Sequence, residues 1–322
     1  MKTTKKGITD LKEINEIGAC RMCVVEVKGA RTLVTACVYP INEGMEVWTN
    51  TPKVIESRKK TLQLLLSNHR KECLSCVRSG NCELQQLCRD LGVTDEHKYD
   101  GEMLESEIDT SAAHMIRDNS KCILCRRCVA VCEKVQGIGV IGANERGFKT
   151  YIGSAFDMGL GETSCVSCGQ CLVSCPFSAI VDKGQIFQTI MALKSESPVY
   201  AILAPAIAGQ FEGLENTKIR GAFQALGFTD VREVAIGADL CTIEEAKDFL
   251  AEVPEKLPFM GTSCCPAWSV MAKKLFPQFK DYISMALTPM VLTARLIKRQ
   301  IPDARVVFIG PCAAKKLEAN RK

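Results

Sequence analysis

The sequence has 322 residues, which is long enough for two or three folded domains. Its net charge is +4, and 24% of its residues are charged. Nucleic acid is not expected as the main partner because the charge is small and scattered, and no run of about 18 apolar residues predicts a membrane helix. No apolar core follows the basic N-terminus, so we expect a cytoplasmic protein without a secretory signal. Nineteen cysteines in such a compartment indicate metal binding rather than disulfides.

The first cysteine group lies in residues 1–54. Cys20, Cys23 and Cys37 stand beside two alternating, strand-like runs, "VVEVKG" and "GMEVWT". The arrangement looks like a plant-type [2Fe–2S] domain, which needs four thiolates. Because the group supplies only three, we predict a partial β-grasp [2Fe–2S] domain with an incomplete ligand set.

The second group lies in residues 55–118, within "HRKECLSCVRSGNC". It places one imidazole and three thiols in an H-x3-C-x2-C-x5-C array, namely His69, Cys73, Cys76 and Cys82. On spacing alone a Cys3His zinc site and an iron–sulfur cluster are equally compatible with this array. Cys88 follows in a helical pattern and is interpreted as a buried structural thiol.

Residues 119–193 contain two four-cysteine runs, "CILCRRCVAVC" and "CVSCGQCLVSCP". Each has the C-x2-C-x2-C-x3-C spacing of bacterial two-cluster ferredoxins, in which the fourth cysteine of each run binds the other cluster. Zinc sites pair two C-x2-C units instead. We predict a two-[4Fe–4S] ferredoxin-like domain, with one cluster at Cys122, Cys125, Cys128 and Cys175 and the other at Cys132, Cys165, Cys168 and Cys171. The link between the runs, "GIGVIGANERG", predicts a hairpin insert.

Residues 194–322 show an α/β pattern. Short apolar runs at 199–206, 258–263 and 304–310 alternate with helical stretches, as expected for a buried parallel sheet. The runs end in Ala204–Pro205–Ala206, Cys264–Cys265 and Pro311–Cys312. Because ligands bind beyond the carboxyl ends of parallel strands, we predict a site where these three ends meet. The chain is therefore expected to be multidomain, with α/β and α+β parts.

The motifs "TSCCPAW" and "PCAAKKLE" resemble two of the three signatures of iron-only hydrogenases, and the order of the upstream cysteine groups resembles that family over the whole chain. The resemblance implies an H-cluster, a [4Fe–4S] cubane joined through a cysteine to a two-iron unit that carries CO and cyanide. The His69 array resembles the His-ligated [4Fe–4S] module of the same enzymes and of complex I, which favours iron over zinc.

The resemblance also implies individual roles in the last domain. Cys265 and Cys312 would bind the cubane, and Cys264 would relay protons. Lys315 would pair with a cyanide ligand, and Pro205 would line the two-iron unit. The proton path would continue through Glu245, Asp248 and Ser284. Without the resemblance, Glu245 and Asp248 are read as a solvated helix face.

Several positions depart from the family pattern. Ala206, Met290 and Gly310 replace a serine, a glutamine and a methionine, which suggests a divergent subgroup. No cysteine stands near Ile8 or Thr9, where related modules carry the fourth [2Fe–2S] ligand. The third hydrogenase signature, which supplies two further cysteines, is not in the sequence. We therefore expect a fragment cut at both ends, with an incomplete catalytic domain that cannot complete the H-cluster alone.

The leading interpretation is an enzyme that interconverts H2 with protons and electrons through a chain of clusters. Its electron partner would be ferredoxin or an NAD(P)-linked flavoprotein, and no membrane span or nucleic acid is involved. Three alternatives remain: an electron-transfer subunit like that of complex I, a hydrogen-sensing homologue, and an iron–sulfur assembly homologue. The motifs "TSCCPAW" and "PCAAKK" disfavour the first, and the upstream modules disfavour the last.

Overall fold

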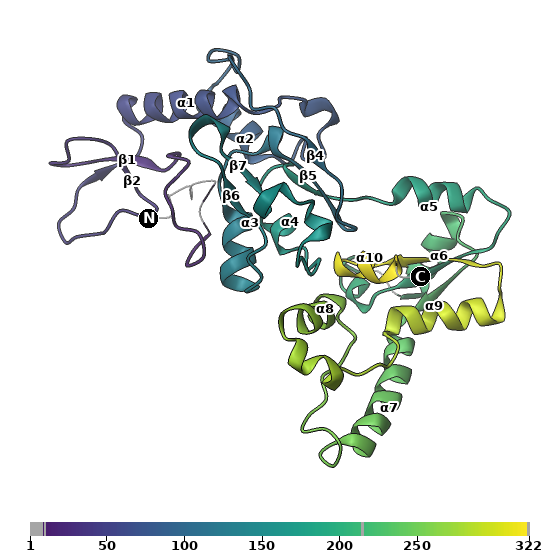
Figure 1. The fold of residues 1–322 in the computed structure, drawn as a ribbon. Coiled ribbons are helices and arrows are strands. Elements are labelled where there is room, and N and C mark those ends of the chain that lie inside the picture. Colours follow the sequence, from purple (N-terminus) through teal and green to yellow (C-terminus); the bar gives the residue numbers. More distant parts are fainter. Residues whose placement is uncertain (1–8, 10, 214–215, 321–322) are drawn as a thin grey trace. The chain divides into compact units, whose positions relative to one another are not determined.

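The computed structural model describes residues 9, 11–213 and 216–320, and these form two units that we describe separately (Figure 1). The first unit comprises residues 1–165 and 169–182, and the second comprises residues 166–168 and 183–322. Within the described residues, no helix is long and apolar enough to cross a membrane.

The first unit begins with a small antiparallel sheet built from valine-rich segments. Strand β1 (Val24–Val27) pairs on one side with β2 (Val34–Thr35) and on the other with β3 (Val47–Trp48). β-branched residues pack well on a pleated surface, and β1 is largely buried. Cys23 directly precedes β1 and Cys37 follows β2, so the sheet holds the segments next to these two cysteines.

Two helices follow the sheet. Helix α1 (Pro52–Ser67) begins with Thr51 as N-cap and proline at its first position, and α2 (Glu83–Leu91) ends at Gly92 in the left-handed conformation. Both are favourable helix ends. Their apolar residues form a core with the first cysteine group and with the ferredoxin-like part; its buried members are Cys20, Met22, Leu62, Leu66, Leu84 and Phe177.

The remainder of the first unit, which we call the ferredoxin-like part after the predicted domain, combines a small sheet with short helices. Strands β4 (Ile108–Asp109), β5 (Met115–Asp118) and β8 (Ile180–Asp182) form an antiparallel sheet in the order β4-β5-β8. Two short helices, α3 (Arg127–Ala130) and α4 (Gln170–Ser174), each follow the second cysteine of a four-cysteine run. The predicted hairpin insert is confirmed, since β6 (Gly142–Asn144) pairs with β7 (Tyr151–Gly153).

The second unit is built on a parallel sheet. Strand β9 (Val199–Leu203) lies between β10 (Asp230–Glu233) and β11 (Arg305–Ile309). Every residue of β9 is buried, and its alternate side chains enter two different cores, as expected for a sheet covered on both faces. The helices are α5 (Ile186–Leu193), α6 (Asn216–Ala225), α7 (Val234–Glu252), α8 (Pro266–Leu275), α9 (Pro289–Gln300) and α10 (Ala314–Ala319).

One predicted strand is wrong. Residues 258–263 are irregular, with a single bridge between Gly261 and Ile283. The third strand of the sheet is β10, whose sequence "DVRE" is mostly polar. Because β10 lies at the edge of the sheet and only Val231 is buried, its apolar pattern is too short to indicate a strand.

Gly237 allows α7 and α9 to pack closely. A Cβ at this position would overlap Thr293 Oγ1 and lie 2.8 Å from the carbonyl oxygen of Pro289. We therefore expect Gly237→Ala to lower the free energy of unfolding by about 1–3 kcal/mol, the usual cost of overpacking. Gly221→Ala in α6 is the matched control: nothing lies within 4 Å of its Cβ, so it should stabilise the helix by about 0.5–1 kcal/mol. Urea unfolding of both variants measures this difference, and equal stabilities would contradict it.

Candidate iron–sulfur and active-site centres

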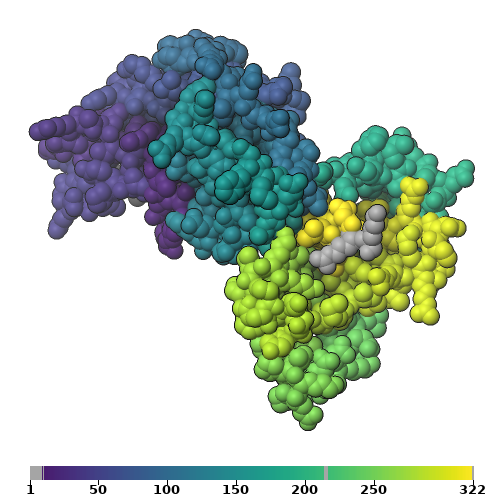
Figure 2. Space-filling model, in the orientation of Figure 1, coloured from purple at the N-terminus to yellow at the C-terminus, as the bar shows by residue number. Residues whose placement is uncertain are grey.

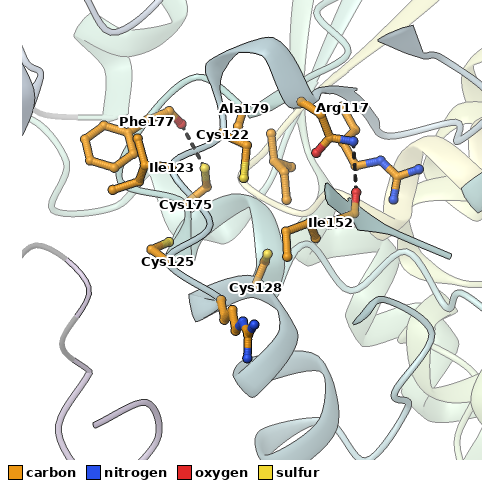
Figure 3. A pocket seen from close by; sticks show the side chains of 12 residues that line it. Arg117, Cys122, Ile123, Cys125, Cys128, Ile152, Cys175, Phe177 and Ala179 are labelled. Atoms are coloured by element: carbon orange, nitrogen blue, oxygen red, sulfur yellow. Dashed lines mark hydrogen bonds between the residues drawn. The ribbon is translucent and has the colours of Figure 1, made fainter. Parts of the chain in front are cut away.

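Four predicted cluster ligands line one pocket in the ferredoxin-like part. The thiols of Cys122, Cys125, Cys128 and Cys175 turn toward a common space (Figure 3), and apolar side chains such as Ile152 complete the wall. The first three come from the loop before α3 and from its first turn, whereas Cys175 follows α4. Four thiols around an apolar pocket are the donor set of a [4Fe–4S] cluster, so these residues fit the group.

The backbone of the two four-cysteine runs has the same unusual conformation. In the first run, Leu124 and Arg126, which flank the second cysteine, have φ of 56° and 59°. In the second run, Ser167 and Gly169 occupy the same positions with φ of 58° and 77°. Non-glycine residues are uncommon in this left-handed region and cost free energy there. The repeated pattern shows that each C-x2-C-x2-C segment follows a defined path.

Burial makes the thiols of this pocket weak acids. It raises the pKa of Cys122 to about 12 and that of Cys125 to about 11, and it raises the pKa of Cys128 well above its usual value. The amide of Leu124 donates to Cys122 Sγ at 3.3 Å, which favours the thiolate. At neutral pH the metal-free thiols therefore hold their protons, and binding of iron has to displace them.

The predicted ligands of the second ferredoxin-like cluster are only partly brought together. Cys132 is buried in the main core of this part, and Cys165 and Cys171 pack against that core. Cys168 belongs to the three-residue segment that groups with the second unit. The ligand set at Cys132, Cys165, Cys168 and Cys171 therefore stays a prediction.

The His69 group lies beside the pocket described above. Burial lowers the pKa of His69, so the imidazole is neutral, the form that binds metals. Its buried Nδ1 atom has no hydrogen-bond partner among the described residues, which leaves a nitrogen available as a ligand. Cys73 is exposed, and Cys76 and Cys82 are partly buried. The unused imidazole nitrogen is a donor that the predicted module needs, and the ligand set His69, Cys73, Cys76 and Cys82 stays a prediction.

Cys88 was expected to be a buried structural thiol, and it is half-buried against the core around α1 and α2. Burial raises its pKa, with smaller contributions from Glu96 and from the thiols of Cys82 and Cys73. Cys88 therefore lies close to two of the predicted ligands of the His69 group.

The first cysteine group contains a close pair. Cys23 Sγ lies 3.3 Å from Cys37 Sγ, because Cys23 precedes β1 and Cys37 follows its partner β2. Cys20 is also buried. The side chain of buried Asn15 donates to the carbonyls of Thr9 and Cys125, at 2.8 and 2.9 Å.

This arrangement fits only part of a [2Fe–2S] site. Three thiols are present, and a buried threonine, Thr9, stands where a fourth ligand was expected; Ile8, the neighbouring candidate position, lies outside the described residues. Across the part of the chain that the structure describes, no three His, Cys, Asp or Glu side chains converge on a point that would hold a single metal ion.

In the second unit, the adjacent cysteines stand at the start of α8. Cys264 and Cys265 are both exposed, and Cys265 is the N-cap residue of α8. Helix α10 packs against α8 and carries Lys315, whose Nζ donates to the carbonyl of Cys264 at 3.0 Å. Cys312, just before α10, is exposed as well. Figure 2 shows these segments, in yellow-green and yellow, on the surface of the second unit.

Pro205 begins a 3-10 turn, Pro205–Ile207, directly after β9. It lines a cavity of about 430 Å³ at the carboxyl ends of β9 and β10, where an open parallel sheet binds ligands. The other lining residues come from the end of β9, from α6, and from β10 with the start of α7, and Cys264, Cys265 and Cys312 are not among them. The structure therefore places Pro205 in a cavity that the three cysteines do not line.

The three predicted proton-path residues differ in exposure. Glu245 is half-buried and Asp248 is exposed on α7, whereas Ser284 is buried. The amide of Ser284 donates to Gly261 at 2.8 Å, which places its segment beside the residues that lead to Cys264. Sequence reasoning overlooked Cys241 on the same helix. Burial raises its pKa, and the next contributions come from Glu245 and Cys264, so Cys241 lies within electrostatic reach of both.

Two more residues were missed. Glu318 accepts hydrogen bonds from Lys315 Nζ at 2.8 Å and from Thr288 Oγ1 at 2.6 Å, and Ser178 lies 2.9 Å from Cys76 Sγ. Glu318 stands three residues after Lys315, a helical spacing that the sequence displays. Ser178 gives no such signal because it is 102 residues away from its partner.

Family models match four consecutive parts of the chain. A 2Fe-2S iron–sulfur cluster binding domain matches residues 4–52, and the NADH-ubiquinone oxidoreductase-G iron–sulfur binding region matches residues 58–97. A 4Fe-4S dicluster domain matches residues 121–179. The C-terminal domain of the iron only hydrogenase large subunit matches residues 197–322.

The curated relatives are likewise hydrogenase chains and an iron–sulfur subunit of NADH-ubiquinone oxidoreductase. The NADP-reducing hydrogenase subunit HndD of Solidesulfovibrio fructosivorans is 37% identical, and Iron hydrogenase 1 of Clostridium pasteurianum is 31% identical, each over 95% of this chain and 56% of the relative. The chain thus spans about half the length of these relatives. The NADH-ubiquinone oxidoreductase 75 kDa subunit of Reclinomonas americana is 32% identical over 53% of the chain and 24% of its own length.

Among solved structures, a chain of the NAD+-reducing [NiFe]-hydrogenase in the H2-reduced state matches with a TM-score of 0.51 and 28% identity. The match covers 55% of this chain and 74% of the other. Residues 197–322 thus match the C-terminal domain of the iron only hydrogenase large subunit, and three iron–sulfur domain matches precede them in the chain.

Proposed function

We propose that this chain carries the electron-transfer clusters and part of the active-site domain of an iron-only hydrogenase, which interconverts H2 with protons and electrons. The observation that carries the proposal is in the second unit. There the Lys315 ammonium lies 3.0 Å from the carbonyl of Cys264, so a cation stands beside the two exposed cysteines of the "TSCCPAW" motif. The identities with two hydrogenase chains support it.

We assign a separate role at the H-cluster site to each of four residues of the second unit. The H-cluster, when bound, supplies the iron at which H2 is formed or split. Cys265 and Cys312 hold the cubane through their thiolates. Lys315 offers a charged donor to an anionic ligand. Cys264 holds and releases a proton at Sγ, since its thiol is exposed and is not needed as a ligand.

Protons then pass between Cys264 and the surface of α7. Ser284, Glu245 and Asp248 are the groups that we assign to this path, in order of increasing exposure. A path from a buried hydroxyl to an exposed carboxylate ends in bulk water, as a proton relay must. Cys241 interacts electrostatically with both Glu245 and Cys264, and we assign it a place beside this path.

Electrons reach the second unit through the iron–sulfur domains of the first. We assign [4Fe–4S] clusters to the His69 group and to the two ferredoxin-like sets, and an incomplete [2Fe–2S] site to Cys20, Cys23 and Cys37. The name of the HndD relative favours an NAD(P)-linked flavoprotein as electron partner, with ferredoxin as the alternative.

A second candidate is an electron-transfer subunit without hydrogen chemistry. The match to the NADH-ubiquinone oxidoreductase 75 kDa subunit over 53% of the chain favours it for the iron–sulfur domains. It leaves residues 197–322, which match the hydrogenase domain, without a role. The hydrogenase proposal accounts for both parts.

The two adjacent cysteines provide the test. In the anaerobically matured full-length protein, Cys264→Ala should keep the iron content and lose most hydrogen turnover, by about 100-fold or more, because removal of a proton-transfer group typically costs about 10²–10⁴ in rate. Cys265→Ala should lose the CO and cyanide infrared bands together with activity, because a ligand is missing. Absence of hydrogen turnover in the matured unaltered protein would favour the electron-transfer candidate or a sensor.

A further inference from the structure

Ser178 connects two cysteine groups that are far apart in the sequence. It lies three residues after Cys175, in the turn between α4 and β8, and is only 5% exposed. Its Oγ lies 2.9 Å from Sγ of Cys76, 102 residues earlier in the chain. The turn that leaves the Cys175 pocket therefore contacts a predicted ligand of the His69 group.

Arg78 makes a second connection between the same two groups. Its amide donates to Cys76 Sγ at 3.4 Å, and its Nη2 donates to the carbonyl of Cys175 at 3.1 Å. The ring of Phe177 also packs edge-on against His69, with 6.3 Å between ring centres. Three contacts thus join the segment Cys175–Ser178 to the loop that carries His69 and Cys76.

The chemistry of the Ser178 contact follows from the state of Cys76. Either atom can donate while Cys76 is a thiol. A thiolate bound to iron only accepts, so the Ser178 hydroxyl must then donate to Sγ. Hydrogen bonds to cluster sulfurs raise the reduction potential, because they stabilise the negative charge that reduction adds.

We propose that Ser178 is a positioning residue that raises the reduction potential of the cluster at His69 and, together with Arg78, forms the electron-transfer contact between that cluster and the one at Cys122, Cys125, Cys128 and Cys175. The inference rests on the proposed function, namely that both groups hold iron. The Ser178 hydroxyl donates to Cys76, a predicted ligand of the His69 cluster, and stands three residues after Cys175, a predicted ligand of the neighbouring cluster. It therefore stabilises the reduced form of the His69 cluster where the two cysteine groups meet.

The test is a redox titration of the anaerobically reconstituted chain, followed by EPR. The signal of the His69 group is identified by its response to His69→Cys, which adds a negative thiolate and lowers the potential. Ser178→Ala should shift the reduction equilibrium of this cluster about tenfold toward the oxidised form, equivalent to about 59 mV for one electron. The signal assigned to the Cys122 pocket should move less.

Two pairs of variants separate the hydroxyl from the fold. Ser178→Thr keeps the donor and should retain the unaltered potential, whereas Ser178→Val has the same shape without the donor and should behave like Ser178→Ala. Ser75→Ala removes a hydroxyl from the same cysteine loop, one that donates to the carbonyl of Glu72 at 3.3 Å, and should leave the potential unchanged.

The possible failures are distinguishable. An unchanged potential in Ser178→Ala and Ser178→Val, with the cluster present, would overturn the inference and leave the proposed function intact. Loss of the cluster from these two variants but not from Ser178→Thr would also overturn it, because the hydroxyl would then serve only to hold the loop. If the unaltered chain contains no cluster at the His69 group, the proposed function itself fails.

Discussion

Replacing Cys175 with alanine is expected to remove one complete [4Fe–4S] cluster, about four of about twelve irons held by three [4Fe–4S] clusters. The thiol of Cys175 lines the same pocket as those of Cys122, Cys125 and Cys128, and it is the one ligand that comes from the other cysteine run. Without it, the pocket offers three thiols whose pKa values are raised by burial. Three such groups hold iron poorly once water reaches the open corner of the cluster.

Iron and sulfide analysis after anaerobic reconstitution measures this loss, and EPR identifies the missing cluster. Cys241→Ala is the matched control: both thiols are buried and donate to a carbonyl, Cys175 to Phe177 at 3.0 Å and Cys241 to Leu287 at 2.8 Å, but Cys241 lies outside the four-cysteine runs. It should keep the full iron content. Cys122→Ala should remove the same EPR signal as Cys175→Ala. If Cys175→Ala instead removed the signal that Cys165→Ala removes, the crossed assignment of the fourth cysteines would be wrong.

Local patterns allowed this pocket to be predicted from the sequence. The C-x2-C-x2-C spacing fixes a loop path that the structure repeats in both runs, with left-handed residues at Leu124 and Arg126 and again at Ser167 and Gly169. Short-range spacing therefore carries most of the information about which thiols converge. The crossed fourth cysteine was predictable only because the spacing of ferredoxins is a known rule.

Contacts between distant segments were beyond the reach of the sequence. Ser178 and Cys76 are 102 residues apart, and Thr288 and Glu318 are 30 residues apart, so no periodic pattern connects them. The edge strand β10 was missed for a related reason: it is defined by parallel pairing with β9 rather than by its own mostly polar residues. Conversely, the apolar run at 258–263 resembles a strand, but it forms only an isolated bridge at Gly261.

Removal of the Glu318 carboxylate is expected to destabilise the second unit strongly. Glu318 is buried and accepts hydrogen bonds from Lys315 Nζ at 2.8 Å and Thr288 Oγ1 at 2.6 Å. In Glu318→Ala the half-buried Lys315 ammonium loses its counter-charge, and Thr288, the N-cap of α9, loses its acceptor. Breaking a buried ion pair in this way typically costs about 3–5 kcal/mol. Because Lys315 keeps the Cys264 carbonyl as an acceptor, we expect the lower end, about 3 kcal/mol.

The chain contains a matched pair that isolates the effect of burial. Glu244 and Lys247 form an ion pair of the same i,i+3 spacing at the same 2.8 Å, but both side chains are 65% exposed, against 14% for Lys315 and 7% for Glu318. Glu244→Ala should therefore change the free energy of unfolding by about 0.5 kcal/mol or less. Urea unfolding followed by the fluorescence of Trp268, in a Trp48→Phe background, reports on the second unit.

Glu318→Gln tests the role of charge, because it keeps an acceptor for Thr288 while removing the counter-charge of Lys315. It should lie between the unaltered chain and Glu318→Ala. Lys315 also donates to the carbonyl of Cys264. If the Lys315 side chain becomes more mobile in Glu318→Gln, the alkylation rate of Cys264 should rise as well. Equal costs for Glu318→Ala and Glu244→Ala would mean that Lys315 is held by the Cys264 carbonyl alone, and that the carboxylate contributes nothing to the position of the cation at the cysteine pair.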